Sequence, residues 1–167
     1  VRGGANGSYV LSNGNFITND DNGYRLWNGN TGELIYDFSK EDGSKIKEYG
    51  ISELQNGNFI TKHLDGSWKL RNGGTGKVIN TLLIEGVVIG DVGFFTLSNG
   101  NFVTGDSEHN NRLLDGNTGE VIITVPFSEW QSLSPDSTYE LPNGNIVARI
   151  SNGIEAGIAV LREGNSG

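Results

Sequence analysis

Two short sequence motifs recur in a fixed order along this chain of 167 residues. The first motif is Leu-x-Asn-Gly-Asn followed by an aromatic or aliphatic residue. Its first asparagine is Asn13, Asn56, Asn99 and Asn143, at spacings of 43, 43 and 44 residues. The second motif is a polar turn that ends at Gly32, Gly76, Gly119 and Gly167. Repetition at a fixed period predicts stacked structural units, each of which needs a neighbour to bury its core.

Each repeat contains four short segments with the alternation and flanking turn residues that are typical of β-strands. In the first repeat one strand is expected at 8–12, a second from 16, a third at 24–27 and a fourth at 33–38. The Asn13-Gly14 pair predicts a type I′ hairpin between the first two, because this dipeptide accepts two positive φ angles. Alternation in the fourth segment is expected to place Leu34, Tyr36 and Phe38 on one face.

Four strands in a repeat of about 43 residues are typical of a β-propeller blade. The chain is therefore expected to be all-β, a β-propeller of four-stranded antiparallel blades with almost no helix. The four repeats are expected to span approximately 1–43, 44–86, 87–130 and 131–167. A β-solenoid is the rival architecture, but its coils are shorter, about 20–29 residues in the leucine-rich family.

The number of outer strands bears on how such blades are assembled. Three of them are expected, at 33–38, 77–83 and 120–125, for four sets of inner strands. One interpretation is that the chain continues into further blades of the same polypeptide. Another is that two chains form a homodimer that closes an eight-bladed ring. A closed four-bladed monomer, which needs strongly wedge-shaped blades, is a third.

Several segments resemble known propeller repeats. Residues 23–33, Gly-Tyr-Arg-Leu-Trp-Asn-Gly-Asn-Thr-Gly-Glu, resemble the end of a WD40 repeat with Trp-Asn in place of Trp-Asp. Residues 114–120, Leu-Asp-Gly-Asn-Thr-Gly-Glu, are similar to the turn of PQQ-like repeats. The Leu-x-Asn-Gly-Asn-Phe motif resembles tandem repeats of large bacterial surface or secreted propeller proteins, integrin-like ones included. The resemblance covers nearly the whole chain and implies a propeller fold. The His and structural Asp of the WD40 polar network are not seen.

Composition excludes several classes of function. The chain has no Cys, so disulfides, thiolate metal sites, cysteine nucleophiles and the adjacent cysteines of some quinoproteins are ruled out. Its net charge of −8 argues against nucleic acid as a partner, since that binding rests on clustered Lys and Arg. No apolar window approaches the roughly 20 residues of a membrane-spanning helix, so no membrane insertion is expected. The bacterial resemblance implies an extracellular or cell-surface location.

One cationic residue recurs at the same strand position in three repeats. The row comprises Arg25, Lys69 and Arg112. It is interpreted as a solvated or inter-blade ionic row, with a ligand-facing ring as the alternative. The segment 127–137 departs from the repeat, and Trp130 within it is a further candidate for ligand binding. Equivalent aromatic residues do not recur in all repeats, which favours blade packing over sugar stacking for Trp27 and Trp68.

A calcium site is the metal hypothesis that the sequence raises, and no other cofactor is expected. Asp106, Glu108 and Asn110 have the alternate-residue spacing of oxygen ligands in calcium loops. Ordinary turn chemistry, in which Asn and Asp cap their own backbone, is the favoured explanation of these residues. The two histidines, His63 and His109, are expected to be solvated loop residues.

The expected function is a non-catalytic structural or protein-interaction module that recognises a protein or glycan surface through loops on a rigid scaffold. The alternative is a carbohydrate-binding, lectin-like propeller. No catalytic residue is assigned, because Ser128, Ser132 and Ser134 have no nearby His and no nucleophile elbow.

Overall fold

The computed structural model describes residues 8–20, 23–40, 46–82, 94–105, 110–125, 138–140, 146–151 and 156–161. Across these ranges the chain forms β-strands joined by tight turns, with a single 3-10 turn, η1 (Phe38–Lys40). None of the helical structure in this part of the chain is of a length and hydropathy that would cross a membrane.

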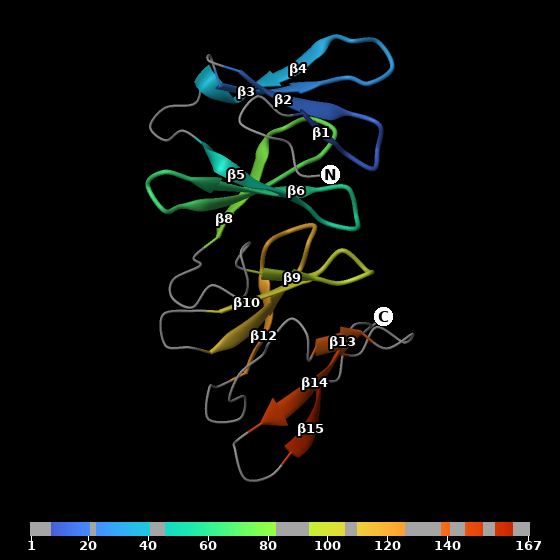
Figure 1. Cartoon of the computed structure of the whole chain (residues 1–167), viewed down its shortest axis with the longest axis vertical. Helices are drawn as coiled ribbons and strands as arrows, with labels where there is room; N and C mark the ends of the chain where they lie inside the picture. Colours follow the sequence, from blue (N-terminus) through green and yellow to red (C-terminus); the bar gives the residue numbers. More distant parts are fainter. Residues whose placement is uncertain are drawn as a thin grey trace. The chain divides into compact units, whose positions relative to one another are not determined.

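The strands form antiparallel sheets in which neighbours along the chain are neighbours in space (Figure 1). The first sheet contains β1 (Ser8–Val10), β2 (Phe16–Asp20), β3 (Gly23–Trp27) and β4 (Leu34–Asp37). The second contains β5 (Ile46–Glu53), β6 (Phe59–His63), β7 (Trp68–Arg71) and β8 (Val78–Leu82). The third contains β9 (Phe94–Thr96), β10 (Phe102–Gly105), β11 (Asn111–Leu114) and β12 (Val121–Val125).

The fourth repeat contributes a three-stranded sheet within the described residues, with β13 (Thr138–Glu140), β14 (Ile146–Ser151) and β15 (Ala156–Leu161). Three four-stranded antiparallel sheets in chain order are the blades that the repeat predicted, and the all-β prediction is confirmed. We call the first three sheets the first, second and third blades.

The chain divides into two compact units. The first unit is Val1–Leu83 with Asn117–Gly119, and the second is Ile84–Gly116 with Glu120–Gly167. The first unit therefore holds the first two blades together with the short turn at 117–119. In the second unit, Leu97, Val103 and Leu113 form a small apolar core with Phe95 packed against it.

The Asn-Gly turns are not of the predicted type I′. The Gly14 N–H donates to the Leu11 carbonyl, and the Leu11 N–H donates to the Asn15 carbonyl. Three residues therefore form the loop, with Gly14 last and in the left-handed region at φ 86°. The Asn13 side chain stabilises this turn by accepting a hydrogen bond from the Asn15 N–H at 3.0 Å. The same backbone bonds recur at 54–58 and 97–101.

A β-bulge at the start of each outer strand changes which face its first residue occupies. Tyr36 pairs with Leu26, but Leu34 pairs with Trp27, and the register shifts between these pairs. The prediction that Leu34 shares a face with Tyr36 and Phe38 is therefore wrong. Leu34 is 46% exposed while Phe38 is buried. Equivalent bulges occur in the second and third blades.

The core of the first unit lies between the first and second blades. Its buried residues come from both sheets: Leu11, Ile17, Tyr24, Leu26, Phe38, Ile46, Ile51 and Phe59. Phe38 meets Phe59 edge to face, with ring centroids 6.1 Å apart. In the second blade both faces are buried, since Ile60 and Leu70 on one face and Phe59 on the other are at most 1% exposed. Burial on both faces is what a sheet stacked between neighbours requires.

Candidate functional site

The predicted cationic row occupies one register position in three blades. In the first blade Arg25 pairs with Thr18 on β2 and with Asp37 on β4. In the second, Lys69 pairs with Thr61 and Thr81. In the third, Arg112 pairs with Thr104 and Thr124. Each cation therefore has a threonine of the second strand directly across from it, and each is partly exposed.

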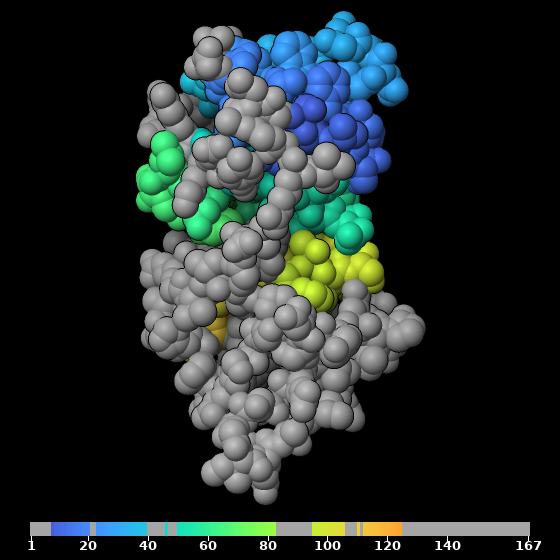
Figure 2. Space-filling view, in the orientation of Figure 1, coloured from blue at the N-terminus to red at the C-terminus, as the bar shows by residue number. Residues whose placement is uncertain are grey.

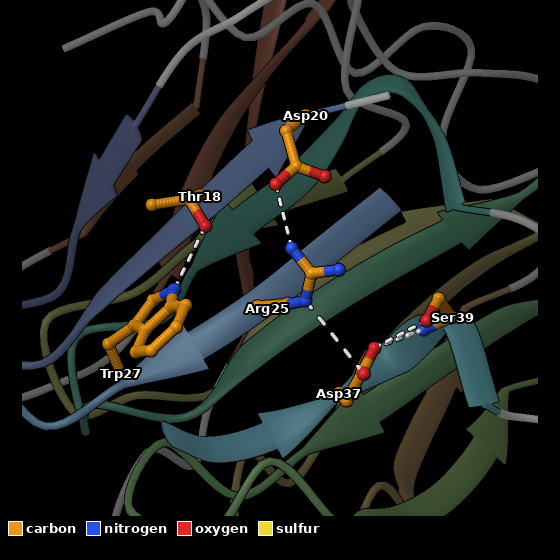
Figure 3. Close-up of polar contacts among 6 residues, drawn as sticks. All are labelled: Thr18, Asp20, Arg25, Trp27, Asp37 and Ser39. Atoms are coloured by element: carbon orange, nitrogen blue, oxygen red, sulfur yellow. Dashed lines mark hydrogen bonds and ion pairs between the residues drawn. The ribbon is translucent and has the colours of Figure 1, made fainter. Parts of the chain in front are cut away.

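Arg25 is held by acidic residues of its own blade (Figure 3). Its Nη1 lies 2.7 Å from Asp20 Oδ2, and its Nε lies 3.8 Å from Asp37 Oδ2. The Arg25 side chain is 21% exposed and that of Asp20 is 47% exposed. Asp37 also accepts hydrogen bonds from the backbone N–H and the hydroxyl of Ser39. Arg25 is therefore paired with acids of its own blade, and both interpretations of the row, a solvated or inter-blade ionic row and a ligand-facing ring, stay predictions.

Two different side chains make equivalent hydrogen bonds in consecutive blades. Trp27 Nε1 donates to Thr18 Oγ1 at 2.9 Å (Figure 3). At the same place in the second blade, Arg71 Nε donates to Thr61 Oγ1 at 3.0 Å. An indole N–H and a guanidinium N–H thus serve the same threonine position.

Arg71 and His63 belong to a buried polar cluster. Arg71 is 0% exposed and His63 is 1% exposed. The Arg71 Nη1 donates to the Gly76 carbonyl at 3.0 Å, and the guanidinium lies 4.9 Å from the centre of the Phe38 ring. His63 Nε2 lies 3.0 Å from Thr61 Oγ1. The expectation that His63 is a solvated loop residue is wrong, because His63 ends β6 on the same face as Phe59 and Thr61.

The two sequence motifs recur with the same spacing because the turns that they form pack against each other. Gly73 of the second motif donates its N–H to Asn58 Oδ1 at 3.3 Å, and Gly116 donates to Asn101 Oδ1 at 3.1 Å. A Cβ on Gly73 would lie 1.8 Å from the Gly57 carbonyl oxygen. Only glycine fits where two turns approach this closely. The recurring Asn and Gly residues are thus explained by turn packing.

Aliphatic side chains are exposed at one position of every outer strand. Leu34 is 46% exposed, Val78 is 40% exposed and Val121 is 48% exposed. Each lies directly before a bulge and pairs with the last residue of the preceding strand. On the third outer strand Ile122 and Ile123 are also exposed, at 46% and 38%. We call Leu34, Val78 and Val121 the outer-edge row.

Several predicted site residues lie outside the described part of the chain. These are Asp106 and Glu108 of the calcium hypothesis, Trp130 and His109. Asn110 is described and is half-buried. Among the residues that the structure describes, no three His, Asp or Glu side chains come together as a metal site. The calcium site and the role of Trp130 therefore stay predictions.

The buried cluster and the outer-edge row were not predicted from the sequence. Alternation along β6 was the available signal for the cluster, because Phe59, Thr61 and His63 share one face. The outer-edge row depends on a bulge in each outer strand, and strict alternation places those residues on the wrong face.

No protein-family model matches the sequence, and no curated protein matches it. Solved structures do align with most of the chain. The WD40 β-propeller domain of Doa1 aligns with 94% of it at 22% identity and a TM-score of 0.48. The computationally designed Ika8 protein aligns with 92% at 18% identity and a TM-score of 0.50. A protein of unknown function from Bacteroides caccae aligns with 87% at 10% identity and a TM-score of 0.39, over 70% of its own chain.

The chain is built of β-propeller blades. It spans 50% of the Doa1 chain and 44% of the designed chain, about half the length of either. At these identities the likeness concerns the fold alone.

Proposed function

We propose that this chain is a non-catalytic module that binds another protein through the outer strands of its blades. The outer-edge row carries the proposal. Leu34, Val78 and Val121 are aliphatic, are at least 40% exposed and occupy the same register position in three blades. Exposed apolar residues that lie next to one another mark interaction surfaces, and Val121, Ile122 and Ile123 are exposed in succession on β12.

The strands that carry the row add a second reason. Within the described sheets β4, β8 and β12 are each the last strand in the order. An edge strand offers backbone N–H and C=O groups to an incoming partner, and neighbouring pockets select its side chains.

The test compares a triple variant of the full chain with a double variant that serves as its control. Leu34→Thr, Val78→Thr and Val121→Thr together remove the row and place a β-branched residue, which suits a strand, at all three positions. The control carries Val10→Thr and Leu64→Thr, which change aliphatic residues that are 73% and 65% exposed away from the outer strands. Protein partners captured from source cells are identified, purified and titrated directly.

We expect the control to bind the purified partner like the parent chain and the triple variant to bind at least about tenfold more weakly, a loss of about 1.4 kcal/mol. Equal binding by the two variants contradicts the proposal. A glycan array tests the lectin alternative against protein binding. Reproducible binding to one sugar class, by a chain that captures no protein partner, favours the lectin alternative. The surface or secreted location, and a closer kinship to WD40, PQQ-like or integrin-like repeats, belong to this proposal as predictions.

A further inference from the structure

The face of the second blade that packs against the first blade has an equivalent in the first blade. In the second blade this face consists of Phe59, Thr61, Arg71 and Gly76, which we call the second-blade seat. Their equivalents in the first blade are Phe16, Thr18, Trp27 and Gly32, which we call the first-blade seat.

The second-blade seat is filled by the outer strand of the first blade. Phe59, Thr61 and Arg71 are all 0% exposed. The Arg71 guanidinium lies over the rings of Tyr36 and Phe38, at 5.9 and 4.9 Å from their centres. A Cβ on Gly76 would lie 2.6 Å from the Tyr36 Cβ, so the seat needs glycine where the outer strand crosses it.

The third repeat follows the same rule within the first unit. A Cβ on Gly119 would lie 2.9 Å from the Asn80 Cβ and 3.1 Å from Leu82 Cδ2. Asn80 and Tyr36 are equivalent, since they pair with Leu70 and Leu26 of the strand before them. Asn80 Nδ2 also donates to the Thr118 carbonyl at 3.0 Å. In both cases, therefore, the outer strand of one blade packs against the left-handed glycine of the next repeat.

Among the residues that the structure describes, no outer strand lies on the glycine of the first-blade seat. Gly32 is left-handed at φ 73°, like Gly76 at φ 72°, but a Cβ there would meet no atom of the described residues within 4 Å. Phe16 and Trp27 are stacked with centroids 6.4 Å apart, and Trp27 is fixed by its hydrogen bond to Thr18 (Figure 3). These three side chains are half-buried. Atoms of the first blade are visible over a broad area of the surface in Figure 2.

We propose that the first-blade seat binds the outer strand of a further blade of the same repeat type, placed ahead of the first blade in the same polypeptide. At Gly76 and at Gly119 the outer strand that packs against the glycine comes from the repeat that precedes that glycine in the chain. We therefore assign the occupant of the first-blade seat to the same source. The strand carries a large side chain at the position of Tyr36 or Asn80 and an apolar one two residues later, as Phe38 and Leu82 are. Leu34 of the outer-edge row is the cross-strand partner of Trp27 in this seat, whereas Val78 and Val121 are not part of it. The test of the seat keeps Leu34 unchanged, so its outcome does not depend on the outer-edge variants.

The test adds the missing strand to the full chain. A copy of residues 1–43, with Phe replacing its Trp27, is fused directly ahead of Val1, which keeps the repeat spacing. Acrylamide quenching of Trp27 is measured as the difference between each protein and its Trp27→Phe variant. We expect quenching of Trp27 to fall at least about threefold in the fusion, because the seat becomes buried as in the second blade.

Two glycine variants of the fusion test the geometry. Gly32→Ala places a methyl group where the incoming strand must cross. Gly66→Ala is the matched control, because Gly66 is also left-handed, at φ 87°, and a Cβ there also meets no atom of the described part of the chain within 4 Å. We expect Gly32→Ala to restore the quenching of the unfused chain and Gly66→Ala to leave Trp27 protected. Equal effects of the two variants overturn the proposal.

A second fusion carries residues 44–86 in place of the copied residues 1–43, so its outer strand presents Asn80 and Leu82. It provides the test if the first fusion misfolds. Protection in either fusion supports the proposal. Unchanged quenching in a folded fusion overturns it. Protection of Trp27 in the unfused chain that grows with protein concentration also overturns it, because a second copy then fills the seat.

Discussion

Tyr36 of the first blade lies against Gly76 of the second so closely that a Cβ on the glycine would be 2.6 Å from the tyrosine Cβ. Gly76 also has a positive φ of 72°. Two separate demands, backbone conformation and space, therefore select glycine at the end of the second motif. This contact joins the repeat in the sequence to the packing of the blades.

Substitution of Gly76 by Ala tests the two demands together. The methyl group has to displace Tyr36, so we expect Gly76→Ala to lower the free energy of unfolding by about 1–3 kcal/mol more than Gly66→Ala does. Gly66 has a similar φ of 87° and open space, so its variant measures the backbone cost alone. Chemical denaturation of both variants gives the difference. Equal losses would mean that the outer strand does not cross Gly76.

The two adjacent glycines of the second-blade turn give a sharper comparison. A Cβ on Gly73 would lie 1.8 Å from the Gly57 carbonyl oxygen, whereas the nearest atom to a Cβ on Gly74 is Asn72 Oδ1 at 3.4 Å. We expect Gly73→Ala to destabilise by more than about 3 kcal/mol and Gly74→Ala by less than about 1 kcal/mol. Thermal unfolding followed by circular dichroism measures both. A mild effect at Gly73 contradicts the contact between the two turns.

The threonine that Arg71 and His63 share is expected to stabilise the second blade. Thr61→Val keeps the shape of the side chain but leaves the buried Arg71 Nε without this acceptor, at a cost of about 1–3 kcal/mol. The matched change, Thr18→Val, removes the acceptor of the half-buried Trp27 and is expected to cost less. Urea denaturation of the two variants tests the order. A larger loss at Thr18 is the contrary result.

Arg25 is expected to contribute little to stability despite its two acidic neighbours. Its partner Asp20 is 47% exposed, so solvent screens the ion pair. We expect Arg25→Gln to change the free energy of unfolding by about 0–1 kcal/mol, and the change to shrink as salt is added. A loss of several kcal/mol that does not respond to salt would show that Arg25 is a core residue instead.

Much of the fold was predictable because the repeat aligns four segments at once. The strand order and the polar turns follow from the spacing of Asn13, Asn56 and Asn99 and from the alternation between them. The turn type was not predictable from Asn13-Gly14 alone, since the closing hydrogen bond runs from Gly14 to Leu11 and enlarges the loop by one residue. The exposed position of Leu34 was not predictable either, because a bulge reverses the face that alternation assigns.

The shared strand position of the cationic row was predictable from the repeat, and Arg25, Lys69 and Arg112 do occupy equivalent positions. The burial of Arg71 and His63 was not predicted, because nothing in a charged residue's own identity shows that the neighbouring blade covers it. The covering residues, Tyr36 and Phe38, lie about 35 positions earlier in the chain, and only the three-dimensional arrangement brings them to Arg71.

We conclude above all that the outer strands of the first and second blades pack against the turn glycine of the next repeat, Gly76 and Gly119. A nuclear Overhauser measurement between the Tyr36 β-protons and the Gly76 α-protons tests it most directly. We predict a strong cross-peak, accompanied by one between the rings of Phe38 and Phe59, whose centroids are 6.1 Å apart. Assigned Tyr36 and Gly76 resonances with no cross-peak between them, in a folded chain, would contradict the claim.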